Sequence, residues 1–448
     1  MGKLLIGMAL PLMASMLIQA LYNIVDSMFV ARVGQNALNA VSLAFPVQNI
    51  LIAVAVGTGV GVSTRMSHQL GGGDTKGAAR TAQHGMLCAT ASWILFAILG
   101  VLFSKPFIAM FTDNPETIQM GTDYLVVVTT LSIGVFIQIM MERLLLATGR
   151  TTLTMWTQLL GAVLNIVFDP LLIFGIGPFP EMGVRGAAIA TVLGQISGAL
   201  LGLVLNLTKN KEISLSFKGF RFRAQAVGEI YHTGLPQMII MAIASVMVGG
   251  LNAILSGFSP LAVNVVGVYF KVQSFVLMPV FGVTNAMIPI IAYNYGAGKR
   301  SRMLRVMQLS LSLVMLVMVL GTLGLNLFPR QILGLFEATE EMYAIGVPAL
   351  RIISWSFPLA GVAITTSSTF PPLGKPLYGL ATSFTRQLVV LLPSAHLLSH
   401  RFGLGATWYS FIIAEIVSVV MVLALFRLLH KNRIMMIPDQ IDDEIEAF

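Results

Sequence analysis

The sequence predicts an all-α membrane protein with twelve transmembrane helices in two pseudo-symmetric six-helix bundles. Three observations lead to this prediction. The chain of 448 residues is 56% hydrophobic and only 10% charged. Twelve long apolar stretches follow one another along it. The second six of these stretches repeat the pattern of the first six at one constant spacing.

The composition indicates that lipid, and not water, surrounds most of the protein. A soluble domain carries about 25% charged residues, and a chain with a mean hydropathy of +0.84 has too few polar groups to cover a surface in water. The net charge of +8 does not indicate nucleic acid, because the basic residues lie in loops between apolar stretches. The single cysteine, Cys88, excludes a disulfide within the chain and lies in an apolar run, as a small core residue does.

Each apolar stretch is long enough to cross a membrane as a helix, which takes about 20 residues. The stretches are apolar on all faces, whereas the strands of a membrane barrel alternate polar and apolar residues. The predicted spans are residues 7–30, 41–69, 82–104, 120–147, 153–176, 184–207, 232–256, 263–294, 303–328, 342–369, 377–398 and 404–429.

The lysines and arginines predict the orientation of these spans. With twelve spans, both termini lie on the same side of the membrane. Seventeen of the 27 Lys and Arg residues fall in the loops and termini of that side, and five fall in the opposite loops. Because basic loops stay on the inside, we expect a multi-pass protein of the cell membrane with both termini cytoplasmic.

The two halves of the chain are related by an offset of 225 residues, which holds without gaps from Pro11 to Gly149 of the first half. The pairs that it relates are Pro11 and Pro236, Phe45 and Phe270, Gln48 and Gln273, Gly57 and Gly282, Gly73 and Gly298, Phe111 and Phe336, and Gly149 and Gly374. The predicted domains are an amino-terminal bundle over 1–207, a cytoplasmic linker over 208–231, a carboxy-terminal bundle over 232–430 and a cytoplasmic tail over 431–448.

An even number of spans in each half makes the repeat parallel, which is an architecture of transporters with a binding site between the halves. The repeat also suggests where a substrate cavity lies, namely near the paired residues Phe45, Gln48, Phe270 and Gln273. This placement depends on the repeat alone.

The ionisable groups inside the predicted spans are not repeated. Asp26, Glu142 and Asp169 lie in the first, fourth and fifth spans, and the offset places them opposite Leu251, Ser367 and Ser394. A charged group at the centre of a membrane costs about 2.5–3.5 kcal/mol on the insertion scale. Such groups usually face the protein interior and serve a function.

The spacing of these groups places polar stripes on three helices of the first half. Gln19, Tyr22 and Asp26 share one face, as do Asn165 with Asp169, and Gln138 with Glu142. If the stripes converge, they form a pocket rich in oxygen atoms. Oxygen ligands suit a hard cation such as Na⁺, and clustered carboxyls at low dielectric can exchange protons near neutral pH. The alternative is that these groups only hydrogen-bond one helix to another.

Other functions lack a signature in the sequence. The glycines at 57–61 lie inside an apolar span without a preceding strand, so they indicate close helix packing and not a nucleotide loop. We find no ATPase motif, no catalytic cluster and no ligand spacing among the six histidines. The expectation is therefore a protein that is neither a primary pump nor an enzyme, and that has no cofactor.

The sequence resembles the multidrug and toxic compound extrusion (MATE) family over nearly its whole length. The residues that carry the resemblance are Pro11, Gln19, Tyr22 and Asp26, with the segments 29–34, 37–42, 149–151, 165–170, 183–191 and 289–298. The resemblance implies two six-helix bundles around a cavity open to one side at a time. It also implies an antiporter that exports amphipathic, often cationic compounds in exchange for Na⁺ or H⁺. We expect a monomer in the lipid bilayer with a small-molecule substrate.

The resemblance also implies roles for individual residues. Asp26, Asn165, Asp169 and Thr191 match the amino-terminal cation site of the family, which would hold Na⁺ if Na⁺ is the coupling ion. Gln19 and Tyr22 match neighbours of that site. Glu142 stands where many relatives are neutral. The seventh and tenth spans lack the carboxylates that some branches use, so coupling is expected in the first half.

A related class of protein is the alternative, namely a flippase for a lipid-linked anionic precursor. Lys271, Arg351 and Arg386 of the second half would then bind phosphate. Glu415, in the twelfth span, is expected either to pair with one of these cations or to serve substrate binding or coupling.

Overall fold

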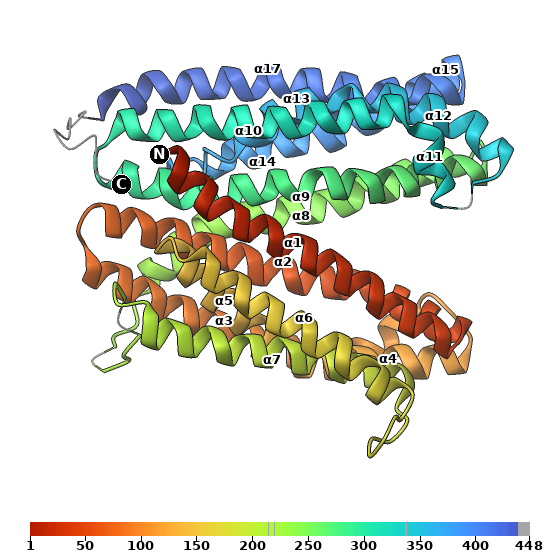
Figure 1. Cartoon of the computed structure of the whole chain (residues 1–448), viewed down its shortest axis with the longest axis horizontal. Helices are drawn as coiled ribbons and strands as arrows, with labels where there is room; N and C mark the ends of the chain where they lie inside the picture. The colour runs from red at the N-terminus through yellow and green to blue at the C-terminus, as the bar shows by residue number, and fades with distance from the viewer. Residues whose placement is uncertain (214, 219, 337, 438–448) are drawn as a thin grey trace. The chain divides into compact units, whose positions relative to one another are not determined.

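The computed structural model describes residues 1–437 except 214, 219 and 337. All long elements are helices, which confirms the all-α fold (Figure 1). The elements of the first half are α1 (Gly2–Val33), α2 (Gln35–Gly71), α3 (Thr75–Ala109), α4 (Pro115–Thr130), α5 (Ile133–Ala147), α6 (Thr151–Ile173) and α7 (Gly183–Lys209). Part of the predicted cytoplasmic tail, residues 438–448, lies outside the described residues.

The second half follows the same plan with more interruptions. Its elements are α8 (Ala224–Ser256), α9 (Pro260–Gly296), α10 (Arg300–Leu327), α11 (Pro329–Gly334), α12 (Glu340–Ser354), α13 (Ser356–Ser367), α14 (Pro376–Phe384), the π-helix η1 (Thr385–Leu391), α15 (Leu392–Phe402), α16 (Leu404–Thr407), α17 (Tyr409–Asn432) and the 3₁₀ turn η2 (Ile434–Met436).

Each of the twelve predicted spans corresponds to helical structure. Nine helices in the described part of the chain are long and apolar enough to cross a membrane. Two further spans are bent pairs, α4 with α5 and α12 with α13. The predicted span 377–398 is divided among α14, η1 and α15. The protein is thus a multi-pass membrane protein with a twelve-helix arrangement.

The fourth and tenth spans are each bent, and the two bends lie at equivalent positions of the repeat. The bends are 43° and 44°. Thr129 and its repeat partner Ser354 each turn the side-chain hydroxyl back to their own helix, at 2.6 Å from Leu125 O and 2.8 Å from Arg351 O. Such bonds compete with the helical ladder. Trp93 Nε1 donates to Thr130 O at 2.8 Å, which gives a carbonyl at the first bend a partner.

The repeat is visible in the backbone as well. Gly73 and Gly298 follow the second and eighth spans with φ of 79° and 68°. Gly149 and Gly374 follow the fourth and tenth with φ of 75° and 73°. A side chain is disfavoured at positive φ, so these four glycines end their helices in the same way in both halves.

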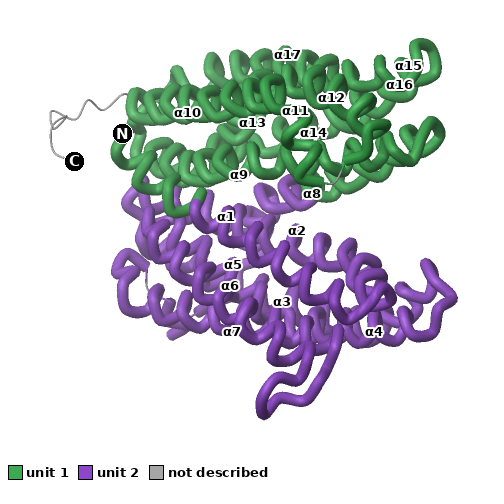
Figure 2. Tube along the Cα trace, turned by 45° about the vertical axis from the view of Figure 1, so that its right-hand side comes forward, with its two compact units in different colours: residues 1–13, 239–448 green, residues 14–238 purple. Residues whose placement is uncertain are grey.

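Packing divides the chain into two units that differ from its simple division into halves (Figure 2). One unit contains residues 14–238, and the other contains residues 1–13 with 239–448. The two boundaries, at Met13 and Met238, are themselves 225 residues apart. Helices α1 and α8 therefore each begin in one unit and continue in the other. The predicted domains are consecutive segments of the chain, and their limits stay predictions.

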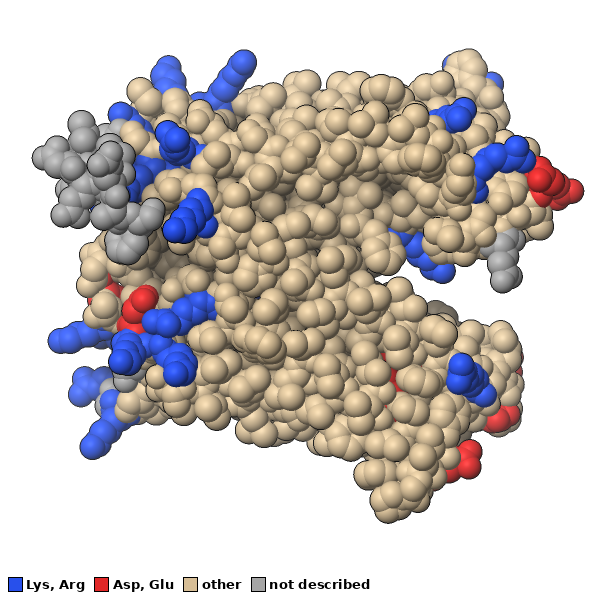
Figure 3. Space-filling model, in the orientation of Figure 1, with Lys and Arg blue, Asp and Glu red and all other residues tan. Residues whose placement is uncertain are grey.

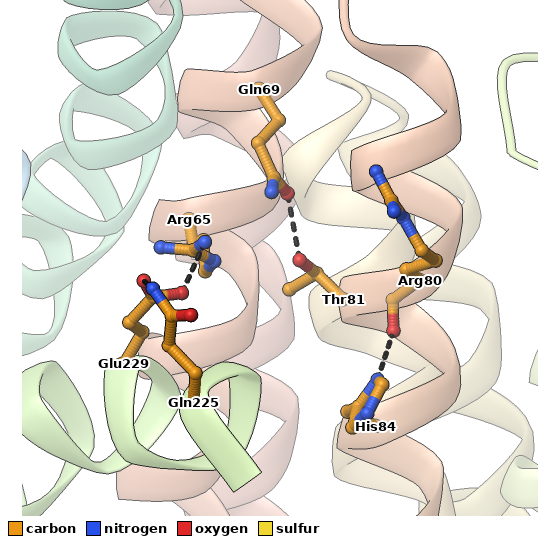
Figure 4. Close-up of polar contacts among 7 residues, drawn as sticks. All are labelled: Arg65, Gln69, Arg80, Thr81, His84, Gln225 and Glu229. Carbon is orange, nitrogen blue, oxygen red and sulfur yellow. Dashed lines mark hydrogen bonds and ion pairs between the residues drawn. The ribbon is translucent and has the colours of Figure 1, made fainter. Parts of the chain in front are cut away.

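The start of α8 is fixed by polar contacts to other helices of the unit of residues 14–238 (Figure 4). Glu229 of α8 forms an ion pair with Arg65 of α2. The buried His84 of α3 accepts the backbone N–H of Arg223 at 3.0 Å. Gly61 of α2 allows a close approach, because a Cβ there would meet Ile230 O at 2.2 Å. These contacts explain why residues 224–238 pack with the first half.

The surface agrees with a membrane protein. Most large exposed side chains along the helices are apolar, and they include Leu10, Val101, Leu102, Leu200 and Val420. On the face in Figure 3, lysines and arginines gather at the helix ends and leave a broad uncharged area between. Cys88 is buried, as expected. The orientation of the termini stays a prediction.

Candidate functional site

The centre of the site is a meeting of two acidic side chains in the unit of residues 14–238. Asp26 lies on α1 and Asp169 on α6, and the two carboxyl groups are within hydrogen-bonding reach of each other. Asp169 is fully buried and Asp26 half-buried. Two carboxylates have no donor to share, so their contact needs a proton or a cation between them.

Asn165 and Thr191 complete this group. Asn165 Nδ2 donates to Asp169 Oδ1 and to Thr191 Oγ1, both at 3.3 Å, and so links α6 to α7. Three buried oxygens of the group receive no hydrogen bond from any described residue, namely Asp26 Oδ1, Asn165 Oδ1 and Asp169 Oδ2. Buried oxygens are normally paired. Three orphan oxygens on neighbouring side chains are oxygen donors of the kind that suits a hard cation.

Gln19 and Tyr22 lie beside this group on the same face of α1. The Tyr22 side chain is near both Gln19 and Asp26. A residue that sequence reasoning missed, Tyr124 of α4, is also close to Asp26 and is 3% exposed. Gln48 of α2 donates to the Tyr124 hydroxyl at 2.9 Å. The predicted cavity residue Gln48 therefore hydrogen-bonds to a tyrosine that is near the acidic pair.

Glu142 lies in a different kind of environment. Its Oε1 accepts from Gln138 Nε2 at 3.0 Å and from Thr157 Oγ1 at 3.1 Å. Its Oε2 accepts from Gln158 Nε2 at 2.9 Å. The neighbouring Arg143 adds a positive charge. This carboxylate has its donors already in place, unlike those of Asp26 and Asp169, and α6 supplies Thr157 and Gln158, which the sequence analysis did not identify.

Glycines position the helices that carry the site. Helices α6 and α7 meet at Gly161 and Gly194, where a Cβ on Gly194 would lie 2.5 Å from Gly161 O and 3.5 Å from Asn165 Cβ. At Gly186 a Cβ would lie 2.4 Å from Leu172 O. Small residues allow membrane helices to approach closely. This packing places Asn165 and Thr191 within hydrogen-bonding distance.

The predicted cavity residues fall in two units. Phe45 and Gln48 are one turn apart on α2, and Phe45 is strongly exposed. Phe270 and Gln273 occupy the equivalent turn of α9 in the other unit and are half-buried. Their grouping into one cavity stays a prediction.

The cations of the second half each have a contact within their own unit. Lys271 Nζ lies 5.6 Å from the centre of the Phe336 ring. Arg351 Nε donates to Asn326 O at 3.3 Å. Arg386 pairs with Glu415 at 2.6 Å, which is one of the pairings that the sequence analysis considers.

Two of the residues that sequence reasoning missed differ visibly from the apolar residues around them. Tyr124 is a tyrosine in the apolar fourth span, opposite Ala349 in the repeat, and Gln158 is a polar residue inside the fifth span. Both depart from the apolar background as Asp26 does. Neutral polar residues are common enough in membrane helices that their position alone does not show which ones meet a carboxyl group.

Comparison with known proteins identifies the family. The sequence profile of the MatE family matches residues 11–171 and 236–396. A protein named FAD transporter from Shewanella oneidensis is 27% identical over 406 residues, which cover 90% of this chain and 89% of the relative. Multidrug export protein MepA from Staphylococcus aureus is 24% identical over 414 residues, covering 92% and 90% of the two chains.

Solved structures show the same fold. An outward-facing multidrug resistance MATE family transporter superposes with a TM-score of 0.90 at 23% identity, over 96% of this chain and 97% of that one. A MOP superfamily transporter from Pyrococcus furiosus, described as having a binding pocket of reverse polarity, superposes with a TM-score of 0.89 at 23% identity, over 97% and 96% of the chains. The two matched segments begin 225 residues apart and cover both repeats, so the chain belongs to the MatE family of membrane transporters.

Proposed function

We propose that the protein is an antiporter that exports amphipathic, often cationic compounds in exchange for entering Na⁺ or H⁺. It acts as a monomer in the cell membrane, with both termini in the cytoplasm. The observation that carries the proposal is the contact between the Asp26 and Asp169 carboxyl groups, with three orphan buried oxygens around them. An ion or proton taken up here would supply the missing partner.

The coupling group consists of Asp26, Asn165, Asp169 and Thr191, with Gln19 and Tyr22 beside it. In the ion-free state the two carboxylates repel each other across a short distance. Binding of Na⁺ or H⁺ removes this repulsion and favours the arrangement in which α1 and α6 hold Asp26 and Asp169 together. Because a ligand shifts an equilibrium only by binding one state better than another, this difference between states couples ion entry to substrate release.

The relatives support export of amphipathic compounds. MepA is a multidrug export protein, and the Shewanella relative is named for transport of FAD, which is an anionic molecule. The substrate is therefore proposed as a class. Acidic side chains such as those of Asp26 and Asp169 are suited to compounds with a positive charge, which would compete with the coupling ion.

The flippase alternative is less well supported. It needs Lys271, Arg351 and Arg386 to act as one phosphate site. In the structure each of these side chains has its own contact on a separate residue, Phe336, Asn326 or Glu415.

The proposal can be tested with the purified protein in proteoliposomes. Efflux of a fluorescent organic cation is measured under an inward Na⁺ gradient at equal pH, and then under an inward proton gradient without Na⁺. We expect one gradient to drive transport against the substrate gradient. Transport that responds to neither gradient would exclude an antiporter coupled to these ions. A protein that transports only anionic lipid-linked compounds would favour the flippase.

The variant Glu142→Gln tests whether Glu142 has a structural role or belongs to the coupling group. The amide keeps one acceptor but turns an N–H₂ towards a donor, so one buried hydrogen bond is lost at a cost of about 1–3 kcal/mol. We expect a lower Tm in detergent, with gradient-driven efflux within about threefold of wild type once folded protein is compared. A loss as large as that of an Asp26 variant, at unchanged Tm, would instead place Glu142 in the coupling group.

A further inference from the structure

The unit of residues 1–13 and 239–448 contains a charged pair that takes no part in the proposed coupling mechanism. Arg386 Nη1 lies 2.6 Å from Glu415 Oε1, and the two side chains are 27% and 10% exposed. Arg386 lies on η1 and Glu415 on α17. Charges this far inside a membrane segment are costly and are usually retained for a function.

The backbone at this pair departs from the repeat. Residues 385–391 form a π-helix, whereas the equivalent residues 160–166 of the first half are part of the regular helix α6. Short π segments occur frequently at functional sites. The offset of 225 places Arg386 opposite Gly161 and Glu415 opposite Ala190. The pair thus occupies the repeat position at which α6 packs closely against α7 in the first half, next to the proposed coupling group.

The Arg386–Glu415 pair leaves hydrogen-bonding groups of both side chains without a partner among the described residues. Among the described residues, Arg386 donates a single hydrogen bond, although a guanidinium has five N–H donors in a planar fork. Glu415 Oε2 is buried and receives no hydrogen bond from any described residue. A stable arginine–carboxylate pair is commonly bidentate. A pair held by one bond, with donors and an acceptor left over, can open to exchange partners at a lower cost.

The surroundings suit an aromatic molecule that carries a charge. The buried Tyr269 is close to both Arg386 and Glu415. Its ring packs edge-on against Phe411, with centroids 5.3 Å apart, and lies 5.4 Å from the half-buried Phe270. The guanidinium therefore has an aromatic neighbourhood.

We propose that Arg386 binds the anionic group, a carboxylate or a phosphate, of the amphipathic substrate, and that Glu415 holds the guanidinium in its absence. The planar fork of arginine matches the two oxygens of either anion. The inference depends on the proposed export function, and it extends the substrate class from cations to zwitterions and anions with an aromatic body. When the substrate anion replaces Glu415 at Arg386, the Glu415 carboxylate is free to bind a cation or a proton.

The test uses two pairs of fluorescent probes that differ in one anionic group. Rhodamine 110 carries a free carboxylate and rhodamine 123 is its methyl ester, while riboflavin 5′-phosphate carries a phosphate that riboflavin lacks. Binding is measured by fluorescence polarisation with the full chain in detergent, and transport is measured in proteoliposomes. The quantity of interest is, for each pair, the affinity of the member with the anionic group divided by the affinity of the member without it.

We expect Arg386→Gln to weaken binding of the members with the anionic group by about tenfold to a hundredfold, as loss of a charge-assisted hydrogen bond does. The members without the anionic group should change less than about twofold. Glu415→Gln should strengthen binding of the members with the anionic group, because it removes the competing carboxylate. Arg330→Gln is the control, since it removes a positive charge from the exposed Arg330–Glu340 pair of the same unit.

The double variant Arg386→Gln, Glu415→Gln replaces the pair by two amides and leaves no buried charge, so it serves if Arg386→Gln alone does not fold. A loss in both probe pairs indicates any oxyanion, and a loss in one pair identifies carboxylate or phosphate. An unchanged ratio in a folded variant, or a wild-type protein that binds neither rhodamine 110 nor riboflavin 5′-phosphate, overturns the inference. Rhodamine 123 efflux by the wild type tests the proposed export separately.

Discussion

Replacing Asp26 with asparagine is expected to abolish ion-driven export while the protein still folds. The amide has the shape of the carboxyl group and brings its own N–H donors to Asp169. The pair is then satisfied without a proton or Na⁺, and ion entry gives no advantage to one state. Losing a charge-assisted interaction of about 3 kcal/mol corresponds to a decrease of roughly a hundredfold. The measurement is efflux from proteoliposomes under the active gradient, together with Tm in detergent.

The matched control for this variant is Asp123→Asn. Asp123 belongs to the same unit, where it accepts from Gln119 at 3.0 Å, and it is not part of the coupling group. It should export at the wild-type rate. If the Asp26 variant also exports at the wild-type rate and keeps its response to the gradient, Asp26 has no part in coupling and the proposed mechanism fails.

The second large effect is expected from Gly194→Ala. The added Cβ would lie 2.5 Å from Gly161 O, a backbone atom that cannot move aside alone. Helices α6 and α7 must then separate, which breaks the 3.3 Å hydrogen bond between Asn165 and Thr191. Overpacking of this kind costs about 1–3 kcal/mol. We expect a lower Tm and, in the folded fraction, a loss of the response to the coupling ion.

Gly228→Ala provides the comparison for that variant. Gly228 is in a helix of the same unit, and no atom lies within 4 Å of a Cβ built there. Alanine in such a helix should leave stability unchanged or raise it by about 0.5–1 kcal/mol. If Gly194→Ala behaves like Gly228→Ala in both Tm and coupling, then the close approach of α6 and α7 is not needed at the site.

The sequence predicted the positions of the spans and of the acidic residues, because both depend on local composition. Twenty apolar residues form a membrane helix in almost any context, and a carboxyl such as that of Asp26 is conspicuous against such a background. The constant offset of 225 residues required only that equivalent positions be compared.

The bends, the π segment and the partners of the carboxyl groups could not be predicted in the same way. The bend near Thr129 depends on a hydroxyl that bonds to its own helix, and serine and threonine do this in many straight helices as well. The four-residue spacing of Gln138 and Glu142 is local, but the bonds from Thr157 and Gln158 depend on how α5 packs on α6. Tyr124 is brought near Asp26 only by the packing of α4, which no local sequence pattern predicts.

The division of α1 at Met13 has a consequence for how a bound ion can act at a distance. Asp26 is 12 residues beyond Ala14, or about 18 Å along the same helix at 1.5 Å per residue. Because α1 is one continuous helix, the residue proposed to bind the coupling ion and the segment 1–13, which packs with the other unit, share the same backbone. Pro11, which cannot donate to the helical hydrogen-bond ladder, lies two residues before the boundary at Met13, so we expect α1 to bend there most easily.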